Sequence, residues 1–138
     1  MKKLAIIIAI LSLLFTSCGG DNSPNIPEYV PSSSETVYIT WDQAADYVGR
    51  VAQVCGPVMD TSWNELAEDS PTYLNMGKPY PEKGRFSVLI RSENRIHFPG
   101  RPEKFYLGKT ICVTGVIQMN NGVPQIEIID SSMLSRTN

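Results

Sequence analysis

Apolar and polar residues alternate along several short segments between residues 51 and 128, and this pattern predicts a β-rich fold. Side chains two positions apart lie on the same face of a strand, so alternation indicates a strand with one buried face. We predict five strands, at 51–60, 72–76, 86–91, around 111–117 and around 126–128. The residues expected to point into the core are Ala52, Val54, Val58, Phe86, Val88, Ile90, Ile111, Val113, Ile117, Ile126 and Ile128.

A helical spacing precedes the first predicted strand. Thr40 can cap a short helix over 41–49, Asp42 suits its first turn and Gly49 can end it. Apolar residues then recur on one helical face. The interval 92–107, with Pro99 and Gly100, predicts irregular chain with a helical turn between the third and fourth strands. The apolar face of the N-terminal helix would comprise Trp41, Ala44, Ala45 and Val48.

Two kinds of glycine signal indicate how the strands connect and bend. The pair Asn121-Gly122 favours a type I′ turn and predicts a hairpin before the last strand. Segments 49–58 and 108–117 each contain a glycine inside the alternation, at Gly56 and Gly115. Such a glycine marks a bulge or a close approach and lets a strand curve tightly. Two strands that bend at the same place suit a small, coiled barrel.

The first eighteen residues have the organisation of a bacterial lipoprotein leader. Lys2 and Lys3 precede an apolar run over 4–14, which only Ser12 interrupts, and small residues lead to Cys18. The apolar stretch is shorter than the roughly 20 residues that a membrane-spanning helix needs. The segment resembles a lipobox, although Phe15 replaces the usual leucine. We predict a signal peptide at 1–17 and lipid attachment at Cys18, with ordinary secretion as the alternative.

Composition divides the rest of the chain into a tether and one domain. Segment 18–37 is rich in Ser, Pro, Asn and Gly, which predicts a flexible tether. One domain is expected over 38–135, followed by a short tail at 136–138. The protein would be anchored to the bacterial cell envelope, and Gly19 after the lipidated cysteine favours the outer membrane where the host has one.

The charge pattern excludes a generic polyanion binder but leaves room for a local basic surface. The net charge is −2, and six acids with one base between 42 and 69 precede eight bases with three acids between 78 and 109. His97 is the single histidine and no cysteine pair has metal-ligand spacing, so we expect no metal site. No catalytic constellation is recognisable, and we expect no enzyme activity and no cofactor.

The segments after the helix resemble a bacterial OB-fold family found alone in secreted proteins or beside nuclease domains. The resemblance covers about 41–134 and includes 47–49, 54–58, 108–115 and 124–128. It implies a five-stranded Greek-key barrel of the nucleic-acid-binding type, with a short N-terminal helix and a helical turn between strands 3 and 4. The most distinctive matching motif is Leu74-Asn75-Met76-Gly77-Lys78-Pro79-Tyr80-Pro81.

In that architecture, ligands lie across strands 2 and 3, which implies a candidate site here. Tyr73 would stack a base beside Asn75, while Lys78, Arg85 and Arg91 would follow a phosphate backbone. Each residue also has an ordinary structural interpretation, as core or as solvated surface. The acidic loop 61–70, preceded by Asp60, would oppose a phosphate chain.

The barrel also places strands 1 and 4 side by side, where Cys55 and Cys112 would both face outward. We predict that they form a disulfide, as an even cysteine pair in an exported protein permits. The sequence therefore predicts a monomeric, membrane-tethered, non-catalytic binding module for single-stranded nucleic acid or another linear polyanion. The alternative is an envelope protein-interaction or structural module with no nucleic-acid binding, distinguished by weak salt dependence.

Overall fold

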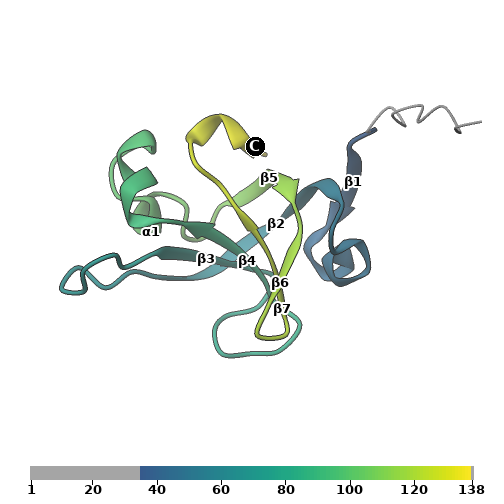
Figure 1. Ribbon diagram of the computed structural model, residues 1–138, viewed down its shortest axis with the longest axis horizontal. Helices are drawn as coiled ribbons and strands as arrows, with labels where there is room; N and C mark the ends of the chain where they lie inside the picture. The colour runs from purple at the N-terminus through teal and green to yellow at the C-terminus, as the bar shows by residue number, and fades with distance from the viewer. Residues whose placement is uncertain (1–34, 138) are drawn as a thin grey trace, which may run out of the picture. The chain divides into compact units, whose positions relative to one another are not determined.

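The computed structural model describes residues 35–137 (Figure 1). The predicted signal peptide (1–17), the lipid-attachment residue Cys18 and most of the predicted tether lie outside the described residues. The strands are β1 (Val37–Thr40), β2 (Val51–Ser62), β3 (Thr72–Met76), β4 (Phe86–Ile90), β5 (Thr110–Val116), β6 (Gln118–Asn120), β7 (Val123–Glu127) and β8 (Leu134–Arg136). The helical segments are η1 (Trp41–Tyr47), η2 (Ser92–His97), α1 (Pro102–Phe105) and η3 (Ser131–Met133).

The strands form one mostly antiparallel sheet in the order β6-β7-β4-β3-β2-β5-β8, with β1 paired to β2. Strands β2, β3 and β4 form a meander, β5 returns antiparallel to β2, and β7 lies parallel to β4. The strand β2 changes partners along its length: its first part pairs with β1 and β5, and its last part pairs with β3. The β-rich class predicted from the alternation is therefore confirmed.

The prediction of five strands closed into a barrel is wrong, because the sheet has eight strands and is not closed. The predicted fourth strand is interrupted at Ile117, which belongs to neither strand. β5 ends at Val116, and β6 begins at Gln118. The backbone N–H of Ile117 donates to Arg50 O at 3.0 Å, and its carbonyl accepts from Gly49 N at 2.7 Å. These bonds direct Ile117 toward the segment before β2. Strands β1 and β8 contain four and three residues, too few to display an alternation.

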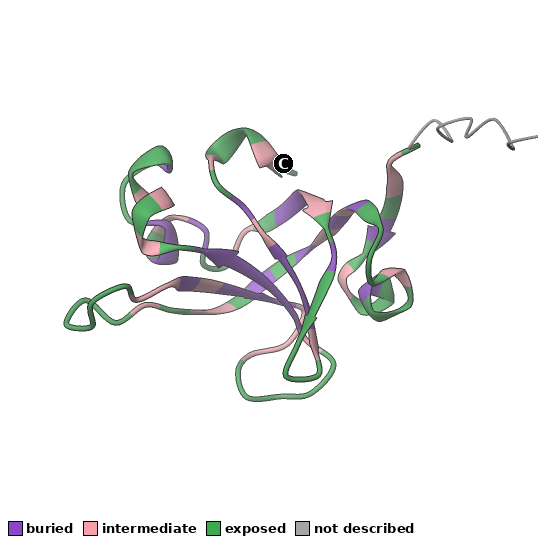
Figure 2. Ribbon diagram, in the orientation of Figure 1, coloured by how far each residue is buried: buried purple, intermediate pink, exposed green. Residues whose placement is uncertain are grey.

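The buried face of the sheet carries the core, which Figure 2 shows running through β2, β4, β5 and β7. All eleven residues predicted to point inward are buried, each with at most 1% of its surface exposed. Burial of apolar surface is the main favourable contribution to the free energy of folding. The largest fully buried side chains are Phe86, Leu74, Met76, Ile90, Ile111, Ile117, Ile126 and Ile128.

The N-terminal helix forms at the predicted place but with a different period. It is a 3₁₀ helix, in which side chains three residues apart share a face. Trp41, Ala44 and Tyr47 therefore pack against the core, whereas Ala45 and Val48 are exposed, contrary to the predicted α-helical face. The backbone N–H of Thr40 donates to Gln43 Oε1 at 3.0 Å and helps to fix the helix start.

The Trp41 ring leaves no room for a side chain at two positions, both of which are glycines. A Cβ atom built on Gly77 would lie 2.0 Å from Trp41 Cδ2, and one built on Gly56 would lie 2.5 Å from Trp41 Cδ1. Gly56 is thus a point of close approach, as the sequence predicted, while the bulge of β2 lies further on, between Val58 and Asp60. Gly77 in addition has a φ of +76°, a conformation that favours glycine.

The predicted hairpin is confirmed between β6 and β7. Asn121 and Gly122 have φ values of +49° and +78°, as a type I′ turn requires at both central positions. The hairpin brings Asn120 beside Gln125, whose Oε1 accepts from Asn120 Nδ2 at 3.4 Å. The β6–β7 hairpin therefore extends the sheet at its β7 edge.

A cation–π and ion-pair cluster holds the acidic connection between β2 and β3. The Arg95 guanidinium lies 3.8 Å from the centroid of Trp63, and Arg101 pairs with Glu65 at 3.6 Å. Both arginines also pair with Glu103, each at 2.9 Å. These contacts fasten the β2–β3 connection to η2 and α1, and they neutralise part of its negative charge.

Candidate ligand-binding groove

A row of polar side chains crosses four neighbouring strands. Asp60 on β2 pairs with Asn75 on β3, Asn75 with Ser87 on β4, and Ser87 with Gln125 on β7. Residues paired in this way share a face, and the core side chains alternate with them on the other face. We call Asp60, Asn75, Ser87 and Gln125 the polar row.

Hydrogen bonds fix the orientation of the polar row. Asn75 Nδ2 donates to Asp60 Oδ2 at 3.1 Å, and Ser87 Oγ donates to Asn75 Oδ1 at 2.8 Å. The backbone N–H of Tyr80 donates to the same Asp60 oxygen at 3.2 Å. Asn75 and Ser87 are only 3% and 4% exposed, so the row is well ordered before any ligand arrives.

The polar row lies along a groove with a volume of about 630 Å³. One aromatic residue comes from the sheet, Tyr73, and another from the connection between β3 and β4, Tyr80, which is 67% exposed. Pockets of this kind orient ligands through a few polar groups among apolar surfaces. The groove is lined by Asp60, Thr61, Ser62, Tyr73, Asn75, Tyr80, Arg85, Ser87, Asn120, Asn121, Val123 and Gln125.

The structure brings three of the five predicted ligand-binding residues together. Tyr73, Asn75 and Arg85 all line the groove. Lys78 lies on the β3–β4 connection outside the groove lining, with Nζ donating to Lys83 O at 3.4 Å. Arg91 lines a neighbouring hollow instead.

The hollow beside the groove has a volume of about 480 Å³ and shares Tyr73 with it. Arg91 contributes to this hollow, but its guanidinium forms two bonds with the Glu127 carboxylate, at 2.7 and 3.0 Å. The hydrogen bond and the negative charge of Glu127 raise the pKa of Arg91. The hollow also contains Asp69 and Glu93, so the surroundings of Arg91 are acidic.

Three bases lie instead on the connection between β3 and β4. Arg85 Nη1 donates to Glu82 O at 2.8 Å, and the guanidinium lies 5.1 Å from the centroid of Tyr80. Arg85 Nε is shielded from solvent and has no acceptor among the described residues. Within the described chain, neither Lys78, Lys83 nor Arg85 forms an ion pair. We call these three residues the basic rim.

The sequence did not identify Asp60, Tyr80 or Gln125 as part of the site. Continued alternation from Ala52 would place Asp60 inside the core, but the bulge after Val58 reverses the face. Tyr80 falls outside the predicted strands, and nothing local distinguishes Gln125 from an exposed strand residue. The Asn121-Gly122 signal did predict the hairpin before the last strand, and Asn120 and Asn121 of this hairpin line the groove.

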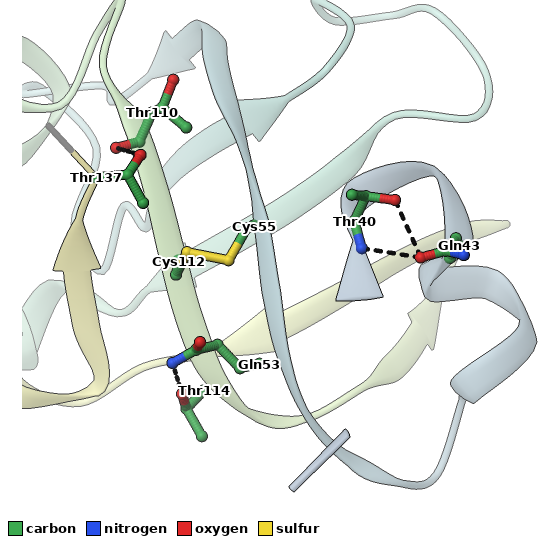
Figure 3. The surroundings of a disulfide bond; sticks show 8 residues. All are labelled: Thr40, Gln43, Gln53, Cys55, Thr110, Cys112, Thr114 and Thr137. Atoms are coloured by element: carbon green, nitrogen blue, oxygen red, sulfur yellow. Dashed lines mark hydrogen bonds between the residues drawn. A yellow bond between two sulfur atoms is a disulfide. The ribbon is translucent and has the colours of Figure 1, made fainter. Parts of the chain in front are cut away.

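The predicted disulfide is confirmed between Cys55 and Cys112, with Cα atoms 4.0 Å apart (Figure 3). The two residues lie opposite each other on β2 and β5. Their neighbours Ala52, Val54 and Val113 point into the core, so the bond lies on the outer face of this part of the sheet. The next pair on that face, Gln53 and Thr114, is joined by a hydrogen bond of 3.3 Å.

The described part of the chain contains no group of three or more His, Cys, Asp or Glu side chains arranged to hold a metal ion. Among residues 35–137, no helix combines the length and apolar character required to cross a membrane. The groove lining offers hydrogen-bonding groups, aromatic surface and charge.

No protein-family model matches this sequence, and a search of curated proteins found no match. Among solved structures, one match is described as a "putative aspartyl-tRNA synthetase from Leishmania major Friedlin". It has 8% sequence identity and a TM-score of 0.46, and the alignment covers 83% of this chain and 22% of that one. This chain thus spans about a fifth of that protein. A likeness this low identifies neither a family nor an activity.

Proposed function

We propose that this chain is a non-catalytic binding module, tethered to the bacterial cell envelope through Cys18, whose groove binds single-stranded nucleic acid or a similar linear polyanion. The observation that carries the proposal is the combination of Tyr73, the polar row and Arg85 around one groove. Lys78 and Lys83 lie on the same β3–β4 connection as Arg85. Proteins that bind single strands combine stacking surfaces with cations that follow the backbone. The tether would keep the groove near the membrane.

The strand connections support an OB-type arrangement without a closed barrel. The β2–β3–β4 meander, the parallel pairing of β4 with β7 and the antiparallel return of β5 to β2 support this interpretation. OB folds bind oligonucleotides and oligosaccharides on the face of strands 2 and 3, between two bounding loops. Here those strands correspond to β3 and β4, and the groove runs across them.

Different residues of the groove would contact different parts of a bound single-stranded nucleic acid. Tyr73 offers a ring face for one base, and the amides of Asn75 and Gln125 offer hydrogen bonds to base edges. The basic rim would hold the phosphates from the β3–β4 connection, whose Tyr80 backbone N–H donates to Asp60. Because Glu127 neutralises Arg91, Arg85 rather than Arg91 would make the stronger phosphate contact.

Fluorescence anisotropy of labelled single-stranded DNA and RNA with residues 19–138, the mature chain without its predicted lipid-attachment residue Cys18, tests the proposal. Three phosphate contacts predict a plot of log affinity against log salt with a slope of about −2. Tyr73→Ala should weaken binding by about 1–3 kcal/mol, the value of one stacked base. Tyr38→Ala is the matched control, because this tyrosine is 74% exposed and lies on β1. No binding at low salt would contradict the proposal.

A second candidate function is protein interaction in the envelope, and two exposed apolar residues favour it. Leu66 and Ile96 are 96% and 84% exposed, and their segments are joined by the cation–π contact of Arg95 on η2 with Trp63. An apolar interface would bind a protein partner with little salt dependence. This second function would be supported if the native chain bound a protein partner but no nucleic acid, and if Leu66→Ser abolished the protein binding.

A further inference from the structure

Asp60 is the one acidic residue in the groove lining, and its surroundings leave part of its carboxylate unused. Oδ2 accepts from Asn75 Nδ2 and from the backbone N–H of Tyr80. Within residues 35–137, Oδ1 accepts no hydrogen bond, and Asp60 forms no ion pair. A carboxylate in a groove, held in place by two donors, thus retains a second oxygen for a ligand.

An ionised carboxylate accepts hydrogen bonds and cannot donate them. It therefore attracts N–H groups of a ligand and repels phosphate and carbonyl oxygens. The four bases differ in this respect. Adenine, cytosine and guanine carry an exocyclic amino group, and carboxylates recognise the cytosine amino group in known protein–DNA contacts. Thymine and uracil offer a single ring N–H between two carbonyl oxygens.

We infer that Asp60 determines the base specificity of the groove: it admits bases that carry an exocyclic amino group and disfavours thymine and uracil. This inference rests on the proposed function, because it presupposes that a nucleic acid occupies the groove. Asn75 and Ser87 act as positioning residues, since their hydrogen-bond chain fixes the Asp60 carboxylate. The basic rim supplies affinity without distinguishing the bases, because phosphate contacts carry no sequence information.

Cytosine and uracil form the matched pair of probes, because both are pyrimidines and differ on one edge. Cytosine has an amino group at C4 and an acceptor at N3, whereas uracil has a carbonyl at C4 and an N–H at N3. The experiment measures the affinity of fluorescein-labelled oligo(dC) and oligo(dU) for the mature chain by anisotropy at slightly alkaline pH. We expect oligo(dC) to bind about tenfold more tightly, which is within the range that one good base contact supplies. Asp60→Asn should remove this preference by strengthening oligo(dU) binding, because an amide can donate to a carbonyl oxygen.

Asp69→Asn is the control, because it removes the same charge from the neighbouring hollow and should leave the preference unchanged. The gain of oligo(dU) affinity in Asp60→Asn cannot come from misfolding, which would only weaken binding. Equal affinity of both oligomers for the native chain would overturn the inference while the proposed function stands. Absence of binding to either oligomer would overturn both. A preference that persists in Asp60→Asn would also overturn the inference.

Discussion

Removal of the Cys55–Cys112 disulfide should cost a large part of the stability of the domain. The bond joins residues 57 positions apart, and in the chain-entropy model closing a loop of this length stabilises the folded state by about 4 kcal/mol. Domains of this size have a total stability of about 5–15 kcal/mol. The double variant Cys55→Ala/Cys112→Ala should therefore remain folded but unfold at a much lower denaturant concentration.

Urea denaturation followed by tryptophan fluorescence measures this loss. With a slope of about 2 kcal/mol per molar urea, the midpoint should fall by about 2 M. The reduced native chain should lose as much as the double variant, because the effect arises from loop closure in the unfolded state. The control Gln53→Ala/Thr114→Ala breaks the adjacent cross-strand contact without opening a loop, and should cost about 1 kcal/mol. A loss of about 1 kcal/mol or less in the disulfide variant would refute the reasoning.

Two further substitutions test the packing and the electrostatics of the scaffold. Gly77→Ala should destabilise the domain by about 3 kcal/mol, because it combines positive φ with a collision against Trp41. Gly100→Ala, also at positive φ but with no atom within 4 Å of the added Cβ, should cost about 1 kcal/mol. Equal losses in thermal melts would contradict this account. Burial favours the neutral form of Glu103, but its backbone hydrogen bond and those from Arg95 and Arg101 outweigh burial and lower the pKa. Because the pKa of Glu103 is lower in the folded state, its ionised carboxylate stabilises the domain at pH values above the unfolded-state pKa of about 4.3. This stabilisation is lost as the pH falls through the folded-state pKa. Glu103→Gln should thus lower the melting temperature at neutral pH and converge with the native chain in acid, whereas a constant difference would argue against the ion pairs.

The strands were predictable because alternation is a local property of the chain. Where prediction failed, the cause was a contact or a backbone geometry that local sequence does not encode. The period of η1 is one case, since a three-residue spacing satisfies both helix types and only the exposure of Ala45 and Val48 separates them. Another is Ile117, whose backbone bonds to residues 49 and 50 end β5.

The site was predictable only as far as the family resemblance brought Tyr73, Asn75 and Arg85 to one candidate site. The bulge after Val58 turns Asp60 into the groove, and a one-residue insertion of this kind reverses every later side chain. Arg91 was expected to contact phosphate, but Glu127 lies 36 positions away and neutralises it. Such pairings depend on strand order, which alternation alone does not determine.

The most direct test of the central claim is a map of where an oligonucleotide contacts the protein. Titration of the isotope-labelled mature chain with a short mixed-sequence single strand, followed by NMR of backbone and side-chain amides, provides that map. The account predicts shifts of the Asn75 and Gln125 side-chain amides and of the backbone of Tyr73 and Arg85. Shifts confined to α1 and β8, or no shifts at low salt, would contradict the assignment of the groove as the binding site.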